Sequence, residues 1–341
     1  MSGAFRRVAL ALDIDGVLLH SKQPIEQAVQ ALKELGGQSG SWRVPLVFLT
    51  NGGGISEAGK ARELEHLLRL RAGVHESQVI LAHTPFRNLG TSRPRETRLV
   101  VGKGSTLEVA RDYWGHQCGI VTTHDLIRSA GTRMVPFSSH IDFGPRGERP
   151  GDGIGSVWVF TDPRGDDWYH DLQVVLDTLL SGGAPVCGGG KFSKGRDQIN
   201  QCIPRLYVSH RDLLFSNGFH SPRLGLGAWV RCLEHMYKSI TGTDLVYECF
   251  GKPNPEVYAL AGTSLRAQAE ALGWDAWGTR TSDTIMAVGD NASVDIRGAN
   301  AAGWESSLVM TGVHQEGDVV EARDWPTHIR PTILEVVRSL S

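Results

Sequence analysis

The chain has 341 residues and a formal net charge of −2, from 35 basic and 37 acidic side chains. This balance excludes the broad electrostatic attraction that nucleic acid or an anionic membrane surface would require. The length predicts a large buried core and two domains, and the sequence contains no run of about 18 apolar residues that would predict a membrane span.

The cysteines and the start of the chain bear on the compartment. Five cysteines are present, an odd number, and none are spaced as Cys-x-x-Cys. This disfavours a disulfide framework or a zinc site and indicates a reducing compartment. The residues before the first predicted strand are too few for a signal or transit peptide. We therefore expect an intracellular protein.

The first predicted strand ends in two acids. Val8–Leu12 is entirely apolar and is followed by Asp13, Ile14, Asp15 and Gly16. Strand side chains alternate, but at a strand end and a glycine turn both acids can face one site. One carboxylate could then attack phosphorus while the other handles the leaving-group proton. The alternative is that these acids only cap a helix.

A second strand of the same kind follows one helix. Apolar residues at helical spacing predict a helix over 24–35. The apolar run 45–49 then predicts a strand that ends in Thr50, Asn51 and a run of glycines beginning at Gly52. The hydroxyl and the backbone N–H groups of this turn are suited to holding phosphate oxygens. A plain turn without a ligand is the alternative.

Residues 52–251 are too many for a single helix and strand, so they predict a second α/β domain. We expect strands over 99–102, 119–122, 157–161 and 206–209, and helices over 106–113, 168–180 and 228–240. The predicted boundaries give a core domain of 1–83 and 241–341 and an inserted domain of 84–240. Polar residues follow two of the inserted strands and are either solvated loop residues or ligands for a second anionic group of the substrate: Arg164, Asp166, Asp167, His170, His210, Arg211 and Asp212.

The last part of the chain returns to the core domain. Lys252 lies between a glycine and a proline-rich turn, and an apolar strand over 285–289 ends in Asp290, with Asp295 five residues later. A further strand over 307–312 and a closing helix over 331–340 are predicted. Ligands of parallel α/β sheets bind beyond the carboxyl ends of the strands. Asp13, Thr50 and Asp290 should therefore converge.

Four segments of the chain, in this order, resemble the haloacid dehalogenase superfamily of phosphohydrolases. The first contains Asp13 and Asp15, the second Thr50, the third Lys252, and the fourth Asp290 and Asp295. The segments Thr50–Ile55, Ala82–Pro85 and Gly289–Asn300 are similar to subfamily IIA, and within it to the eukaryotic group of the cat eye syndrome critical region protein. The resemblance implies a Rossmann-like parallel-sheet core with an inserted α/β cap of the C2 type. His210-Arg211-Asp212 departs from the Asn-Pro-Asp of many relatives, which puts substrate specificity in question.

The resemblance also implies a mechanism. Asp13 would form an aspartyl phosphate, and Asp15 would protonate the leaving alcohol and later activate water. Thr50, with the N–H groups of Asn51 and Gly52, would hold the phosphoryl oxygens, and Lys252 would neutralise negative charge.

Clustered carboxylates repel one another unless a cation is present, and their oxygens suit Mg²⁺. The expected metal ligands are the side chains of Asp13 and Asp290 and the backbone carbonyl of Asp15. Asp295 would act mainly without binding the metal itself, by orienting metal-bound waters or Lys252.

The sequence thus predicts a Mg²⁺-dependent phosphatase for a small phosphorylated metabolite, with no nucleic-acid partner. Two alternatives stay open: a phosphotransferase or mutase that uses the same site, and a non-catalytic binding or interaction protein that retains the fold. The resemblance allows a homodimer formed through the cap. It also allows a mitochondrial location as an alternative to the cytoplasm, if a presequence is missing from this chain.

Overall fold

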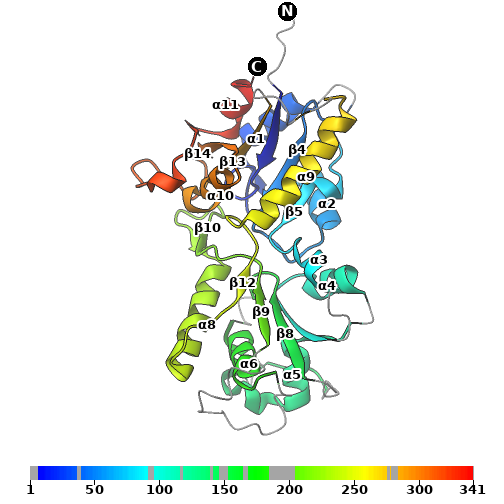
Figure 1. The fold of residues 1–341 in the computed structure, drawn as a ribbon, viewed down its shortest axis with the longest axis vertical. Helices are drawn as coiled ribbons and strands as arrows, with labels where there is room; N and C mark the ends of the chain where they lie inside the picture. Colours follow the sequence, from blue (N-terminus) through cyan, green and yellow to red (C-terminus); the bar gives the residue numbers. More distant parts are fainter. Residues whose placement is uncertain are drawn as a thin grey trace, which may run out of the picture. The chain divides into compact units, whose positions relative to one another are not determined.

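The computed structural model describes residues 7–36, 40–90, 96–115, 118–138, 141–145, 153–163, 168–183, 204–274, 277 and 283–340. The chain divides into two compact units (Figure 1). Unit 1 comprises Met1–Pro85, Leu214–Leu224 and Phe250–Ser341, and unit 2 comprises Phe86–Leu213 and Gly225–Cys249. Residues 214–224, predicted to lie in the inserted domain, therefore cluster with unit 1, and residues 241–249, predicted to lie in the core domain, cluster with unit 2.

Unit 1 is built on a six-stranded parallel sheet. In spatial order its strands are β15 (His328–Arg330), β14 (Glu305–Val309), β13 (Thr284–Gly289), β1 (Val8–Leu12), β4 (Leu46–Thr50) and β5 (Val79–Leu81). Its helices are α1 (Glu26–Leu35), α2 (Glu57–Leu68), α9 (Pro255–Ala271), α10 (Arg297–Ala301) and α11 (Ile333–Arg338), with short turns η1 (Glu76–Gln78), η6 (Ala292–Ile296) and η7 (Ala322–Asp324).

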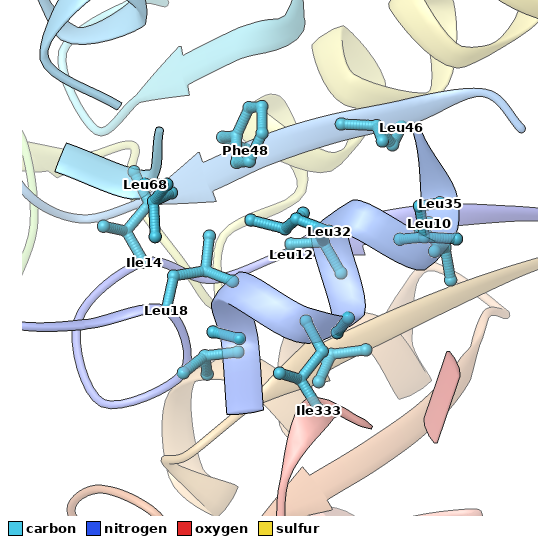
Figure 2. Packing of buried hydrophobic residues seen from close by; sticks show 14 of the residues in the cluster. Leu10, Leu12, Ile14, Leu18, Leu32, Leu35, Leu46, Phe48, Leu68 and Ile333 are labelled. Atoms are coloured by element: carbon cyan, nitrogen blue, oxygen red, sulfur yellow. The ribbon is translucent and has the colours of Figure 1, made fainter. Parts of the chain in front are cut away.

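The alternation of side chains along β1 explains why helices cover both faces of this sheet. Leu10 and Leu12 pack with Leu32 of α1 in the larger core cluster, which Figure 2 shows with Phe48 of β4. Ala9 and Ala11 point to the opposite face and join a second cluster with α9 and α10. A strand that is buried on both faces has no polar alternation, which is why β1 and β4 are continuous apolar runs.

Two short antiparallel ribbons complete unit 1. One pairs β2 (Leu19–His20) with β3 (Gln23–Pro24), and the other pairs β10 (Leu214–Phe215) with β11 (Arg223–Leu224). Because Pro24 belongs to β3, the first helix begins at Glu26 rather than at the predicted residue 24.

Unit 2 contains a five-stranded parallel sheet in the order β12 (Glu248–Cys249), β9 (Arg205–Val208), β8 (Ile154–Val159), β6 (Thr97–Val101) and β7 (Ile120–Thr122). Its helices are α3 (Phe86–Leu89), α4 (Thr106–Trp114), α5 (Thr123–Ala130), α6 (Trp168–Leu180) and α8 (Leu226–Thr241), with short turns η3 (Thr132–Met134) and η4 (Pro136–Ser138). The guanidinium of the buried Arg98 lies 4.7 Å from the ring centroid of Trp114.

The predicted fold class, α/β with parallel sheets, is confirmed by both sheets. Within the residues that the structure describes, no helix has both the length and the apolar composition needed to cross a membrane.

Candidate active site

The carboxyl ends of three neighbouring strands bring the predicted residues of unit 1 together. Asp13 follows β1, Thr50 ends β4 and Asp290 follows β13, and all three side chains are buried. The Asp13 N–H donates to the carbonyl oxygen of Val288 at 2.9 Å, so the ends of β1 and β13 are held in register. The common direction of the strands is what makes residues far apart in sequence converge here.

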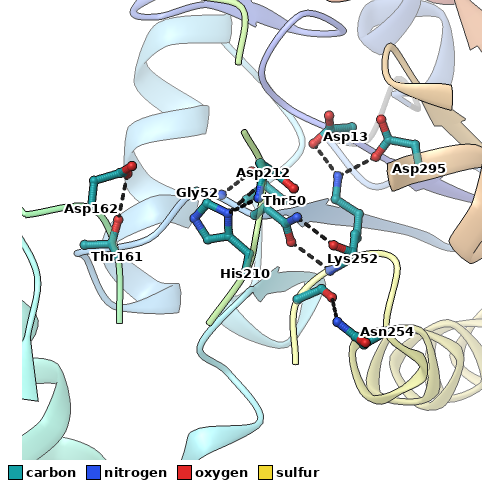
Figure 3. Close-up of polar contacts among 12 residues, drawn as sticks. Asp13, Thr50, Gly52, Thr161, Asp162, His210, Asp212, Lys252, Asn254 and Asp295 are labelled. Carbon is teal, nitrogen blue, oxygen red and sulfur yellow. Dashed lines mark hydrogen bonds and ion pairs between the residues drawn. The ribbon is translucent and has the colours of Figure 1, made fainter. Parts of the chain in front are cut away.

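Lys252 lies at the centre of the site. Its Nζ is 2.7 Å from Asp13 Oδ1 and 2.7 Å from Asp295 Oδ1, as Figure 3 shows. The same ammonium donates to the carbonyl oxygen of Leu49 at 2.9 Å. An ammonium has three protons to donate, so each has an acceptor in this arrangement. The lysine is therefore fixed rather than solvated.

Asn51 holds the backbone of Lys252 in place. Its Nδ2 donates to the Lys252 carbonyl oxygen at 3.0 Å, and its Oδ1 accepts the Lys252 N–H at 2.8 Å. From the sequence, the backbone N–H of Asn51 is predicted to bind phosphate. The structure adds a separate role for its side chain, which connects the end of β4 to the lysine turn.

Thr50, Gly52 and Asp15 meet on the other side of the site. The Gly52 N–H, expected to hold phosphate, donates to Thr50 Oγ1 at 2.9 Å in this structure. A Cβ added at Gly52 would lie 3.2 Å from Thr50 Oγ1 and 3.6 Å from Asp15 Oδ2. The absence of a side chain at Gly52 thus keeps the space between the hydroxyl and the second aspartate open.

Two glycines make room for Asp290. A Cβ at Gly16, which has φ +82°, would fall 2.2 Å from Asp290 Oδ2, and a Cβ at Gly312 would fall 1.8 Å from the same oxygen. That oxygen accepts the Val313 N–H at 2.6 Å. Any larger residue at either glycine would displace the carboxylate.

Asp295 lies closer to the centre than the sequence suggested. It belongs to η6, a π-helical turn, and its Oδ2 accepts the Asn291 N–H at 3.0 Å. Carboxylate oxygens of Asp13, Asp290 and Asp295 all lie within 4.8 Å of one another. Asp295 thus pairs with Lys252 and also contributes an oxygen to the acidic cluster.

The electrostatics of this cluster are governed by burial. The pKa of Asp290 is raised to about 7, mainly by burial and further by repulsion from the Asp295 carboxylate. Burial also raises the pKa of Asp13 well above its usual value, although Lys252 acts against it. Burial acts to lower the pKa of Lys252, but Asp13 and Asp295 outweigh it and hold that pKa well above its ordinary value. One ammonium does not fully compensate the buried carboxylates.

The candidate residues of the inserted segment take different positions in unit 2. The His170 ring packs against His124 and Phe143, with centroid distances of 5.2 and 5.4 Å. Arg211 pairs with Glu234 at 3.1 Å, so it has a structural partner. His210 is buried, and its Nδ1 lies 3.6 Å from Asp212 Oδ2. Residues Arg164, Asp166 and Asp167 lie outside the described residues.

Several contacts were not predicted from the sequence. These are the Leu49 carbonyl, the Asn51 amide, the Val313 N–H and the close approach of Gly312. Backbone carbonyls and N–H groups have no residue-specific signature, so sequence reasoning could not single them out. Gly312 is the last residue of the strand predicted over 307–312, whereas β14 ends at Val309, so its position near the carboxyl end of a core strand was the available signal for it.

Comparisons with protein families agree with this geometry. A model described as haloacid dehalogenase-like hydrolase matches residues 10–114, and a model of HAD-hydrolase-like domains matches residues 249–336. Between them the matched segments contain Asp13, Thr50, Lys252 and Asp290.

Similar folds occur among solved structures. A possible sugar phosphatase of the HAD superfamily from Cytophaga hutchinsonii has a TM-score of 0.64 at 18% identity and covers 96% of this chain and 95% of its own. The glycerol phosphate phosphatase of Mycobacterium tuberculosis, solved with magnesium, has a TM-score of 0.58 at 22% identity and covers 97% of this chain and 76% of its own. At these identities the likeness establishes the fold alone.

Two yeast proteins are similar in sequence. A cardiolipin synthase/mitochondrial hydrolase fusion protein of Schizosaccharomyces pombe is 32% identical over 90% of this chain, which spans only 49% of that relative. A mitochondrial hydrolase of Saccharomyces cerevisiae is 32% identical over 92% of this chain and 90% of its own length. With the family models and the site geometry, this shows that the chain belongs to the haloacid dehalogenase-like hydrolases.

Proposed function

We propose that this protein is a magnesium-dependent phosphatase that hydrolyses a small phosphorylated metabolite through an aspartyl phosphate on Asp13. The observation that carries the proposal is the position of Lys252 Nζ, 2.7 Å from both Asp13 and Asp295, beside the third carboxylate of Asp290. A buried nucleophilic carboxylate with a fixed cation next to it suits attack on a dianionic phosphoryl group.

The donor set fits a hard divalent cation. Three carboxylates lie within 4.8 Å of one another, with one ammonium to balance them, and burial raises the pKa values of Asp13 and Asp290. Mg²⁺ would be held by the side chains of Asp13 and Asp290 and the Asp15 carbonyl oxygen. Asp295 would orient metal-bound waters or Lys252. When bound, it would neutralise charge on the carboxylates and the phosphoryl oxygens.

Asp13 and Asp15 would carry out the two chemical steps of the reaction. A carboxylate oxygen of Asp13 attacks phosphorus, and the bond from phosphorus to the leaving oxygen breaks. Asp15 gives that oxygen its proton. Asp15 next takes a proton from water, the water oxygen attacks phosphorus, and the bond to Asp13 breaks to release inorganic phosphate.

The phosphoryl oxygens would be held by groups around Thr50. The Thr50 hydroxyl and the N–H groups of Asn51 and Gly52 would donate hydrogen bonds to these oxygens. The Gly52 N–H would exchange its present acceptor, Thr50 Oγ1, for a phosphate oxygen. Lys252 stabilises negative charge that develops as the phosphoryl group transfers. Asn51 fixes that lysine through its two hydrogen bonds to the backbone.

Unit 2 would act as the C2-type cap and admit small metabolites rather than macromolecules. We also infer a mitochondrial location, supported by the names of the two yeast relatives, one a mitochondrial hydrolase and the other a fusion of cardiolipin synthase with a mitochondrial hydrolase. Cell fractionation of the tagged full-length protein tests the location. Analytical ultracentrifugation tests the homodimer that the resemblance allows.

The proposed activity is tested with p-nitrophenyl phosphate and a panel of small phosphorylated metabolites, with Mg²⁺ or with EDTA. We expect turnover that requires Mg²⁺ and falls at least about 1,000-fold in Asp13→Asn. The matched control is Asp112→Asn, an exposed aspartate of α4, which should keep wild-type activity.

The same assay separates hydrolysis from transfer. With glycerol added, a hydrolase releases equal amounts of p-nitrophenol and inorganic phosphate, whereas a transferase releases less phosphate than p-nitrophenol. Full activity in Asp13→Asn, or turnover unaffected by EDTA, would contradict the proposed mechanism.

A further inference from the structure

Tyr258 connects the lysine turn to the turn that carries Asp295. It belongs to the first turn of α9, shortly after Lys252 in the sequence, and its side chain is buried. Its hydroxyl lies 3.2 Å from the carbonyl oxygen of Asp295 and 3.4 Å from the carbonyl oxygen of Val294. A phenol has one proton to donate, so the two carbonyl oxygens share it. Both acceptors belong to η6.

The η6 turn differs from an ordinary helical turn. It is π-helical over Ala292–Ile296 and continues directly into α10. Single π-helical turns are rare and are often found at functional sites. Tyr258 supplies this turn with a hydrogen-bond donor from a different helix, α9. The hydroxyl therefore helps to fix the position of the η6 backbone.

The Tyr258 ring is held closely against this part of the chain. It belongs to the core cluster that contains Ala9 and Ala11 of β1, and it contacts Trp304 edge to face, with ring centroids 5.3 Å apart. A Cβ added at Gly298 would lie 2.1 Å from the Tyr258 hydroxyl oxygen and 2.3 Å from its Cζ. The absence of a side chain at Gly298 thus lets α10 approach the hydroxyl, and close packing leaves the ring little room to move.

The backbone and the carboxylate of Asp295 have different partners. Its backbone carbonyl accepts from Tyr258, whereas its carboxylate accepts from Lys252 Nζ at 2.7 Å and from the Asn291 N–H at 3.0 Å. Figure 3 shows the contact with the lysine. A Cβ added at Gly289 would lie 2.2 Å from the Cβ of Asp295, so Asp295 packs directly against the end of β13. A shift of the Asp295 backbone would therefore move the acceptor of the lysine ammonium.

These contacts close a loop of interactions around the lysine turn. Lys252 and Tyr258 are joined along the chain through the start of α9, and both side chains reach Asp295, one at its carboxylate and the other at its backbone. The ammonium that lies 2.7 Å from Asp13 Oδ1 is thus held by an acid whose own backbone is held by the tyrosine. The position of this ammonium decides how well it stabilises charge on the nucleophile and the phosphoryl group.

We propose that Tyr258 is a positioning residue, whose hydroxyl holds the η6 turn so that Asp295 keeps the Lys252 ammonium beside Asp13. This inference rests on the proposed phosphatase function. The hydroxyl acts through Asp295 and Lys252, whereas the phosphoryl oxygens are held by the turn that begins at Thr50. Loss of the hydroxyl should therefore weaken stabilisation of the transition state more than binding of the substrate.

The test compares Tyr258→Phe with wild type, using p-nitrophenyl phosphate and saturating Mg²⁺. The substitution removes the hydroxyl and keeps the ring in its core cluster. We expect kcat to fall about three- to tenfold, which is the loss typical of one hydrogen bond, while KM changes by less than about twofold. Tyr237→Phe is the matched control, because Tyr237 of α8 is equally buried, 3% exposed as Tyr258 is, but lies in unit 2. Its kcat should be that of wild type.

A double substitution distinguishes positioning from a general structural role. In Asp295→Asn the carboxylate that Tyr258 is proposed to place is removed, so adding Tyr258→Phe should change kcat by less than about twofold. A general structural role would lower kcat by the same factor in both backgrounds, because independent effects add in free energy.

Hydrogen exchange gives a readout that does not depend on turnover. The Asn291 N–H donates to Asp295 Oδ2, so its exchange reports on the position of that carboxylate. We expect exchange over residues 291–297 to be at least about threefold faster in Tyr258→Phe and unchanged in Tyr237→Phe. This measurement also decides the question if turnover in the Asp295→Asn background is too slow to compare.

Wild-type kcat or unchanged exchange in Tyr258→Phe would overturn the proposal, as would an equal fall of kcat in both backgrounds. A rise of KM at unchanged kcat would also overturn it, because the hydroxyl would then act on substrate binding. Absence of turnover in the wild-type protein would contradict the proposed function alone, since the exchange measurement still tests whether Tyr258 holds the η6 turn.

Discussion

At the scale of single residues, the site depends on charge balance in a dry environment. Lys252, Asp13 and Asp295 are all buried, and the two ion pairs are 2.7 Å long. Removing one member of such a group leaves a charge that neither water nor a partner stabilises. The free energy of unfolding that a substitution removes therefore depends on which charged partner remains.

The first prediction concerns Lys252→Met. We expect it to lower the free energy of unfolding of the metal-free protein by about 3–5 kcal/mol, because two carboxylates lose their common cation. Adding Asp295→Asn should recover part of that loss, since one of the two carboxylates is removed. Urea unfolding of the wild type, both single variants and the double variant measures this coupling.

Additive effects of the two substitutions would contradict this electrostatic account, because independent sites add while coupled sites do not. Lys33→Met on α1 is the matched control for the change from lysine to methionine. Lys33 lies on the exposed side of its helix and should change stability by no more than about 0.5 kcal/mol.

At the scale of elements, helix ends are fixed by local side-chain contacts. The last helix, α11, begins with a capping box. Thr332 Oγ1 accepts the Leu334 N–H at 3.1 Å, and the Glu335 carboxylate accepts the Thr332 N–H at 3.1 Å. Ile333, Leu334, Val336 and Val337 of this helix belong to the larger core cluster of unit 1. The capping box thus fixes the residue at which α11 begins, and with it the start of this part of the core.

The second prediction is that Thr332→Ala costs about 1 kcal/mol of stability at neutral pH. The hydrogen bond from Thr332 lowers the pKa of Glu335, so its carboxylate stabilises the fold above the ordinary glutamate pKa. That contribution is lost as pH falls through the lowered pKa. The difference between the variant and wild type should therefore shrink in acid.

Urea unfolding at pH 7 and near pH 4 measures this difference. A stability difference that stayed constant, or grew, on acidification would contradict the role assigned to the Glu335 carboxylate. Thr263→Ala on α9 is the matched control, because Thr263 is exposed and donates to a carbonyl inside its helix rather than capping it.

At the scale of the whole molecule, all residues of the candidate site belong to unit 1. The chain crosses between the units several times, yet Asp13, Thr50, Lys252, Asp290 and Asp295 lie in the same compact unit. A ligand of this site binds folded unit 1 and stabilises it by mass action. Unit 2 holds none of the proposed metal ligands.

The third prediction is that Mg²⁺ at about 100 times its dissociation constant stabilises unit 1 by about 2.7 kcal/mol. Hydrogen exchange should slow at the strands β1, β4 and β13 and change less in β6 and β8. Asp290→Asn should abolish the effect. Equal protection of both sheets, or protection that persists in Asp290→Asn, would contradict the assigned metal site.

Much of the architecture could be predicted from the sequence because its signals are local. The apolar run Val8–Leu12 is β1 as predicted, and the helix over 168–180 has the predicted bounds. Strand β8 begins at Ile154 rather than at residue 157, because Ile154 and Ser156 pair with Thr97 and Arg98 of β6. Boundaries that depend on a neighbouring strand cannot be found in the strand's own sequence.

The sequence by itself determined the parallel α/β fold, the acids after β1 and β13 and the lysine that would serve them, because strand ends and proline or glycine turns are short-range features. Only the tertiary structure decided that Lys252 bridges Asp13 and Asp295, that Gly16 and Gly312 enclose Asp290, and that the 214–224 hairpin packs in unit 1. Those contacts join segments up to about 300 residues apart in sequence, and they form where packing and buried charge, rather than local propensity, select the neighbour.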